Sequence, residues 1–174
     1  MSSHQITDGF QGKWFFWALL LLGLLTGGCG GPGSPTSPSI NVDPSEVEFQ
    51  LLHLTNGERS SADVDPDLTP DTILGEIARS HSYAMRDQGF IGHESADGKT
   101  LRQRLEEAGI DFSRAAENLA EVTNTSNPAS FAHGLLMDSE RHRTNILDPR
   151  FSSVGIGVSR SDNTFWITQI FIKP

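Results

Sequence analysis

Cysteine is almost absent from this chain, which has a single one, Cys29, among its 174 residues. A lone cysteine cannot form an internal disulfide, so the fold must be held together by its hydrophobic core. The sequence also lacks a Gly-rich phosphate loop, a Cys-x-x-Cys pair and any internal repeat. It therefore offers no evidence for a phosphate-binding loop, a paired-cysteine site or a repeat architecture.

Basic residues are also few, and this limits the partners that the surface can attract. Lysine and arginine total 13 against 22 aspartates and glutamates, which gives a formal net charge of -9 and a pI near 5.0. No Lys/Arg patch interleaved with aromatic residues is present. Such a surface repels nucleic acid and anionic lipid at neutral pH, so we expect no nucleic-acid partner. The acidity is explained by solubility alone.

The longest apolar run lies near the N-terminus, over residues 14–25, and follows Lys13. It is shorter than the stretch of about 20 apolar residues that spans a membrane. Its length fits the hydrophobic region of a secretory signal peptide. The run leads into Leu25-Thr26-Gly27-Gly28-Cys29, which resembles a bacterial lipobox, so we predict a signal peptide over 1–29 and lipidation of Cys29. An uncleaved anchor and a cytosolic protein with an apolar tail are the alternatives.

The segment after Cys29 is predicted to be a tether. Residues 30–43 are rich in glycine, proline and serine, and they lack the apolar surface needed to offset the entropy of ordering. Residues 44–174 have the length of one ordinary domain. The lipid and the disordered tether would hold this domain at a membrane outside the cytoplasm. A secreted protein without the anchor is the alternative.

Capping residues and apolar spacing predict four helices ahead of the C-terminal strands. Ser45-Glu46-Val47-Glu48 has the form of a capping box and leads into a leucine-rich run. The second helix has Thr69 as its cap and Pro70 as its first helical residue. A further capping box, Thr100 to Gln103, begins the third helix, and Asn127-Pro128 opens the fourth.

The C-terminal part changes to a period of two, which is typical of strands. Val154-Gly155-Ile156-Gly157-Val158 alternates large and small residues, and residues 165–172 are rich in strand-favouring types. Asp162-Asn163 between them suits a hairpin turn, and residues 117–122 are predicted as a third, shorter strand. Helices first and an antiparallel sheet later predict an α+β layered domain.

Three short segments place metal-capable or proton-transferring side chains among turn and packing residues. They carry His93 in Gly92-His93-Glu94-Ser95, Glu117 in Ala116-Glu117-Asn118-Leu119-Ala120, and His142 within residues 139–147. Two imidazoles and a carboxylate that lie so far apart in the sequence make sense together if the fold gathers them. We therefore predict that they meet in one cleft.

These segments, in this order, resemble the CAP superfamily, which includes cysteine-rich secretory proteins, antigen 5 and pathogenesis-related proteins. Its domain is also called the SCP domain, and the resemblance is to the bacterial branch. It begins with an Asn-x-x-Arg helix in residues 51–59 and continues through the segments of His93 and Glu117. It extends over Ser-x-x-His-Arg-x-Asn-Ile-Leu at 139–147 to a strand at 151–158. The resemblance implies a three-layer α-β-α sandwich with a central antiparallel sheet.

Three positions depart from the family pattern. Ala116 replaces the glycine before the motif glutamate, Leu136 replaces a frequent tryptophan, and Glu140-Arg141 replaces Pro-Gly. The last change alters the charge and local geometry of the cleft rim rather than the fold. We include Glu140 among the cleft residues, as a candidate replacement for the family's second acidic residue.

The resemblance implies that His93, Glu117 and His142 line the family's central cleft, where two histidines can hold a divalent metal such as zinc. Neutral imidazole is a good zinc ligand, a carboxylate can be a third ligand or orient a histidine, and water can complete the site. We therefore name His93 and His142 as metal ligands. Two distant histidines without a His-Glu-x-x-His helix are a weak zinc signal by themselves. A hydrogen-bonded polar network and a catalytic site remain the other interpretations.

Other polar residues are expected to have structural roles. His81 lies on the apolar face of its helix and should be partly buried and hydrogen-bonded, although it could reach the cleft. His53 and His133 are expected on helix surfaces. Asn118 and Asn145 should hold loops through hydrogen bonds from side chain to backbone.

Two functions from different classes fit these features. The first is a membrane-tethered binding module outside the cytoplasm, a monomer whose partner is a small ligand or an envelope or other protein. The second is a metal-dependent hydrolase acting on peptide or cell-envelope material. No serine or cysteine is paired with a base by any motif, so we prefer the binding module. A structural spacer with a relic cleft is a weaker third interpretation.

Overall fold

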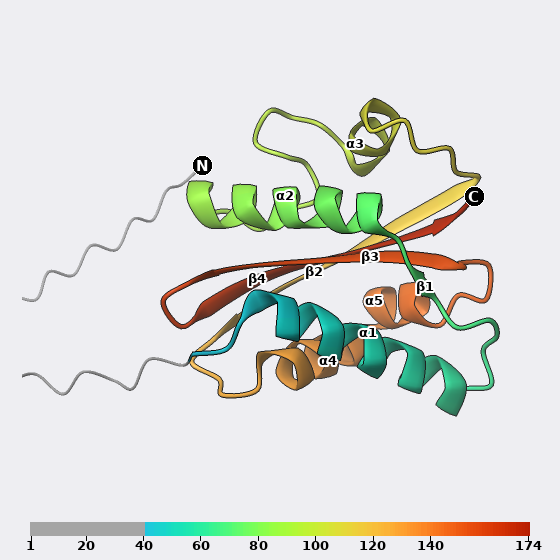
Figure 1. The fold of residues 1–174 in the computed structure, drawn as a ribbon, viewed down its shortest axis with the longest axis horizontal. Coiled ribbons are helices and arrows are strands. Elements are labelled where there is room, and N and C mark those ends of the chain that lie inside the picture. The colour runs from blue at the N-terminus through green and yellow to red at the C-terminus, as the bar shows by residue number, and fades with distance from the viewer. Residues whose placement is uncertain (1–40) are drawn as a thin grey trace, which may run out of the picture. The chain divides into compact units, whose positions relative to one another are not determined.

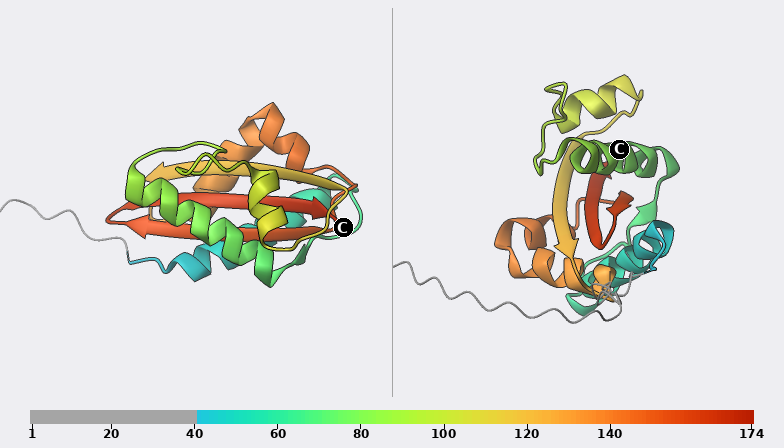
Figure 2. Two further views of the ribbon diagram at one scale, coloured as in Figure 1. Left: turned by 90° about the horizontal axis from the view of Figure 1, so that it is seen from above. Right: turned by 90° about the vertical axis from the view of Figure 1, so that its left-hand side faces the viewer.

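A four-stranded sheet between two layers of helices forms the part of the chain that the computed structural model describes, residues 41–174 (Figure 1). The predictions for the signal peptide, Cys29 and most of the tether fall outside these residues. Two helices cover one face of the sheet, α2 (Thr72–Gln88) and α3 (Leu101–Glu107). Three cover the other face, α1 (Pro44–Ser61), α4 (Pro128–Asp138) and α5 (Glu140–Ile146). The predicted α-β-α sandwich is therefore confirmed, and Figure 2 shows its layers from two further sides.

The sheet has the order β1-β3-β4-β2, with strands β1 (Thr69–Pro70), β2 (Arg114–Thr123), β3 (Ser153–Ser161) and β4 (Thr164–Lys173). The three long strands are antiparallel, as predicted, and β3 and β4 form the predicted hairpin. The two-residue β1 pairs with β3 in parallel, so the sheet as a whole is mixed. Strand β2 is an edge strand, and it contacts α3 of one helical layer and α4 and α5 of the other.

The period of two in β3 divides the core between the two faces. Its large residues, Val154, Ile156 and Val158, belong to the core shared with α1 and α4. Its glycines, Gly155 and Gly157, face α2, where an added Cβ would overlap the helix backbone. The small residues therefore let α2 lie directly on the sheet.

The second helix begins later than the sequence predicts. Thr69 and Pro70 are in β1, because they pair with Ser153 and Val154 of β3. Asp71 is the N-cap instead, and its carboxylate accepts a hydrogen bond from the backbone N–H of Leu74 at 2.9 Å. Pairing with β3 thus places in a strand the two residues that local capping rules assign to the helix.

The first predicted capping box is also wrong. Asp43 is the N-cap of α1, and its side chain accepts from the backbone N–H of Ser45. Glu48 instead accepts from Arg79 at 2.8 Å and from the backbone N–H of Val158 at 3.0 Å. The ion pair with Arg79 therefore replaces the hydrogen bond that the capping box predicts within the first turn.

The caps of the third and fourth helices are confirmed. Thr100 and Gln103 form a full capping box, and Asn127 accepts from the backbone N–H of Ser130.

Helix α5, which the helix patterns did not predict, follows α4 after Ser139 alone. It is fixed to α1 by the buried guanidinium of Arg59. This group donates to the backbone carbonyls of Ile146 and Asp148 at the end of α5. It also donates to the carbonyl of Pro66.

Within residues 41–174, no helix combines the length and apolar character that crossing a membrane requires.

Candidate functional site

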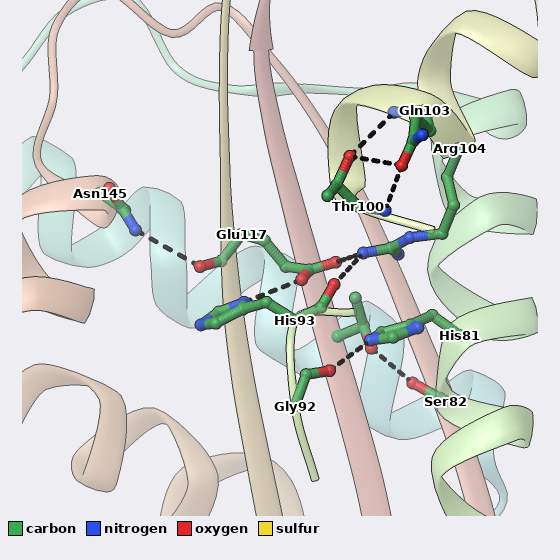
Figure 3. Close-up of polar contacts among 10 residues, drawn as sticks. His81, Ser82, Gly92, His93, Thr100, Gln103, Arg104, Glu117 and Asn145 are labelled. Atoms are coloured by element: carbon green, nitrogen blue, oxygen red, sulfur yellow. Dashed lines mark hydrogen bonds and ion pairs between the residues drawn. The ribbon is translucent and has the colours of Figure 1, made fainter. Parts of the chain in front are cut away.

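The candidate site is built around the carboxylate of Glu117, which lies on the edge strand β2 with a side chain only 2% exposed. Its Oε1 accepts a hydrogen bond from Arg104 Nη2 of α3 at 2.8 Å. Its Oε2 accepts from His93 Nδ1 at 2.9 Å (Figure 3). Both oxygens of a buried carboxylate are thus engaged, one by a charged partner, which offsets the cost of burying it.

The contact with Glu117 determines how His93 is presented. A carboxylate can only accept, so the imidazole Nδ1 carries the proton and, in the neutral ring, Nε2 keeps its lone pair. The hydrogen bond to Glu117 raises the pKa of His93, and partial burial opposes this shift. The His93 side chain is 55% exposed. The result is an oriented imidazole whose free nitrogen is accessible.

The loop that carries His93, residues 89–100, is held at two points. Arg104 Nη2 donates to the carbonyl oxygen of His93 at 2.9 Å. His81 Nε2 on α2 donates to the carbonyl oxygen of Gly92 at 2.8 Å. These bonds attach the loop to α3 and to α2, so the direction of His93 is set by two helices.

Arg104 matches the family's helix after the His-containing loop, but the sequence analysis did not place it in the cleft. Its side chain is only 9% exposed and contacts both Glu117 and the backbone of His93. A buried carboxylate on a strand needs a positive partner, and this requirement is the signal that could have placed Arg104 beside Glu117. The requirement applies only once Glu117 is known to be buried, and the sequence does not show this.

His142 reaches the same edge from the opposite helical layer, on α5. Asn118 donates to its backbone carbonyl at 3.2 Å, and Asn145 donates to Asn118 Oδ1 at 2.9 Å and to the carbonyl oxygen of Glu117 at 3.5 Å. The two asparagines make the predicted hydrogen bonds from side chain to backbone, but these bonds join strand β2 to helix α5 and do not hold loops. Burial, followed by the charges of His93 and Arg141, lowers the pKa of His142. The bonds from Asn118 and Asn145 hold the helix of His142 beside β2, and we call His93, Arg104, Glu117 and His142 the edge site.

The other residues named from the sequence, Glu140, His53 and His133, have no described contact with the edge site. Glu140 is exposed in the first turn of α5 and lines a separate hollow with Arg143 and Asp148, so no described contact joins it to the edge site. His53 is exposed, as expected. His133 is buried rather than on the surface, because its helix face packs inward and its Nε2 lies 3.8 Å from Glu58.

His93 and His142 are the candidate metal ligands of the edge site, and among residues 41–174 no described contact joins their two rings. Among residues 41–174, no group of three or more His, Cys, Asp or Glu side chains is arranged to hold a metal ion. Glu117 directs one oxygen toward Arg104 and the other toward His93. It can orient a ligating imidazole, which is the usual arrangement of a carboxylate behind a histidine ligand. His93 Nε2 and the His142 ring remain as donors, with water for the other positions.

Comparisons with known proteins agree with this fold. The family model described as "Cysteine-rich secretory protein family" matches residues 52–171. The uncharacterized protein YkwD of Bacillus subtilis is 34% identical over 137 residues, which are 79% of this chain and 51% of YkwD. The chain thus spans about half the length of this relative.

Solved structures show the same similarity. An extracellular protein containing a SCP domain from Bacillus anthracis matches with a TM-score of 0.68 and 30% identity, over 82% of this chain and 45% of that one. An outer surface protein from Borrelia burgdorferi has the same TM-score at 19% identity, over 76% of this chain and 96% of its own, and supports the fold alone. The match over residues 52–171, together with the identity to the Bacillus proteins, shows that the chain belongs to the cysteine-rich secretory protein (CAP) family in its bacterial form.

Proposed function

We propose that this protein is an extracytoplasmic CAP-domain binding module whose edge site holds a divalent metal, such as zinc, through His93 and His142. The observation that carries the proposal is the Arg104–Glu117–His93 chain. It buries a carboxylate behind an exposed imidazole and leaves the outer ring nitrogen free. Such a chain fixes the tautomer of a metal-binding histidine and increases its basicity.

A bound metal would supply a Lewis acid to which an oxygen or nitrogen of a ligand could bind. The chain's own residues supply the rest. Glu117 keeps the His93 Nδ1 proton in place, Arg104 balances the charge of Glu117, and Asn118 holds the backbone of α5 beside the strand. Because metal competes with the proton for Nε2, the raised pKa of His93 predicts weaker metal binding as the pH falls.

Binding of a ligand is favoured over hydrolysis by the state of Glu117. A hydrolase that uses a metal-bound water needs a base that can accept its proton. Glu117 is the buried carboxylate of the edge site, and both of its oxygens already accept hydrogen bonds. A metal-dependent hydrolase of peptide or envelope material therefore remains the less favoured function.

Metal analysis of the purified protein tests this proposal. The parent chain should contain near-stoichiometric zinc after dialysis against zinc at low concentration, and the His93→Ala, His142→Ala double variant should contain less than about a tenth of it. His53→Ala is the matched control, since it removes an exposed imidazole from α1 and should leave the zinc content unchanged. Equal zinc in the parent and the double variant would refute the metal site.

A location outside the cytoplasm is supported by the description of the similar Bacillus anthracis protein as extracellular. The signal-like run over residues 14–25 and the lipobox-like segment ending at Cys29 support the same location and a lipid anchor. Fractionation tests the anchor. The Cys29→Ser variant should move from the membrane fraction to the soluble fraction, whereas Ser34→Ala in the predicted tether should stay with the membrane. A Cys29→Ser variant that stays with the membrane would exclude lipidation as the anchor.

A further inference from the structure

An arginine of helix α5 lies next to the edge site and has no partner of its own. Arg141 directly precedes His142 and, with Glu140, replaces the Pro-Gly of the family motif. It is exposed, and within residues 41–174 it makes no hydrogen bond or ion pair. This chain therefore carries a positive charge at a position where the family motif has a glycine and no side chain.

The attachment of α5 to the edge strand places Arg141 on the side of β2. Asn118 of β2 donates to the backbone carbonyl of His142 at 3.2 Å, and Asn145 of α5 donates to the carbonyl oxygen of Glu117 at 3.5 Å. Figure 3 shows Asn145 extending toward Glu117. Residues four apart lie on one face of a helix, so Arg141 shares the face of α5 from which Asn145 contacts the strand.

The charge of Arg141 acts on both imidazoles of the edge site. Burial and then the charge of His93 lower the pKa of His142, and the charge of Arg141 adds to this effect. The hydrogen bond to Glu117 raises the pKa of His93, and the charge of Arg141 is among the effects that oppose this rise. This agrees with the helix geometry, which brings Arg141 to the same edge of the sheet.

The carboxylates near Arg141 do not balance its charge. Glu117 is paired with Arg104 at 2.8 Å, so these two charges compensate each other. Glu140, the neighbour of Arg141, lines the separate hollow beside α5. Glu94 is exposed, and within residues 41–174 neither it nor Glu140 forms an ion pair with Arg141. The edge site therefore has one uncompensated positive charge at its rim.

We propose that Arg141 selects ligands of the edge site that carry a single oxyanion, a carboxylate or a phosphodiester. A guanidinium presents a planar pair of N–H donors that matches two oxygens of such a group. The formal net charge of -9 repels a long polyanion, whereas one anionic group can still pair with Arg141. The inference rests on the proposed binding function and names the chemical class of its ligand, with or without a bound metal.

Titration of the metal-free full chain in micelles of an uncharged detergent, followed by NMR, tests the proposal. The probes are two matched pairs: N-acetylglycine with N-acetylglycinamide, and dimethyl phosphate with trimethyl phosphate. The second member of each pair is neutral. At low ionic strength, at least one anion should shift the ring signals of His93 and His142 saturably and bind at least about threefold more tightly than its neutral partner. Equal binding within both pairs, or no saturable shift, overturns the proposal.

Three variants assign the preference to one side chain. Arg141→Gln should remove the preference for the anion, whereas Arg141→Lys should keep part of it, since lysine keeps the charge but not the paired donors. Arg143→Gln is the matched control, because Arg143 is exposed on the same helix and lines the separate hollow. A preference that persists in Arg141→Gln, or that Arg143→Gln removes equally, contradicts the role of Arg141.

The two probe pairs also identify the source of the oxyanion. A preference for N-acetylglycine alone supports a carboxylate ligand, and a preference for dimethyl phosphate alone supports a phosphodiester. Either result, or both together, supports the selection by Arg141. Because metal is absent throughout, a missing zinc site would not change these results. A chain that binds zinc but shows no preference for either anion would overturn this inference and leave the proposed metal site intact.

Discussion

A single buried carboxylate organises the edge site. Glu117 is 2% exposed, and it is acceptable in that position because Arg104 and His93 each occupy one of its oxygens. Removing its charge would leave the guanidinium of Arg104 buried without compensation. The energetic cost of breaking a buried pair exceeds that of breaking a surface pair, because water cannot replace the lost partner.

Glu117→Gln should therefore lower the free energy of unfolding by about 3 kcal/mol, measured by urea denaturation. The matched control is Glu106→Gln, which removes the same charge from the exposed pair with Arg102 on α3. That change should cost about 0.5 kcal/mol or less. Similar losses in the two variants would mean that the Glu117 pair contributes no more than a surface pair.

At the scale of elements, the close approach of α2 to β3 sets the spacing of one helical layer. The alternation of Val154 to Val158 predicts a strand, and the structure adds that the glycines mark the face on which a helix lies. A Cβ at Gly157 would overlap the backbone of α2 at Ala78 and Arg79. Backbone atoms cannot move aside as a flexible side chain can, so the layer itself would have to shift.

Gly157→Ala should reduce stability by about 3 kcal/mol or more, or prevent folding, as measured by thermal denaturation with circular dichroism. Gly134→Ala on α4 is the control, since no atom lies within 4 Å of its added Cβ. Because alanine favours a helix interior over glycine, this control should gain about 0.5–1 kcal/mol. A parent-like melting curve for Gly157→Ala would show that α2 does not rest on the strand as described.

The starts of the helices show where local patterns succeed and where they fail. Thr100 and Asn127 cap their helices as predicted, because each bond joins residues within one turn. Thr69 and Glu48 have equally good local patterns, yet β3 and Arg79 compete for them. Partners that are distant in the sequence have no local signature, so a single sequence cannot show this competition.

At the scale of the whole molecule, Asp148 joins parts of the chain that are far apart. Its carboxylate accepts from Arg114 at the start of β2 at 3.1 Å and from Arg150 at 2.7 Å, while its side chain is 4% exposed. These bonds, first among them those with Arg150, lower the pKa of Asp148 from its ordinary 3.8 to about 2. Since the folded state binds the proton less tightly, ionised Asp148 stabilises the fold.

This contribution should be complete above the ordinary pKa of 3.8 and disappear as the pH falls through about 2. The free energy of unfolding of the parent should therefore fall toward that of Asp148→Asn by about 2 kcal/mol between about pH 5 and about pH 1.5. Urea denaturation across this range measures the difference. Asp138→Asn, an exposed control on α4, should keep a constant offset from the parent. A constant offset for Asp148→Asn as well would exclude the proposed coupling.

The sequence by itself determined the class of this protein and the residues of interest. Periods of 3.6 and 2 and the local caps predicted an α+β layered domain, and the segments around His93, Glu117 and His142 carried the resemblance that implied the family and its sandwich. Only the tertiary structure decided that these segments meet at the edge strand β2 and that Arg104 pairs with Glu117 there. The reason is physical: periodicity and capping act between neighbours in the chain, whereas burial and charge compensation depend on which distant residues come into contact.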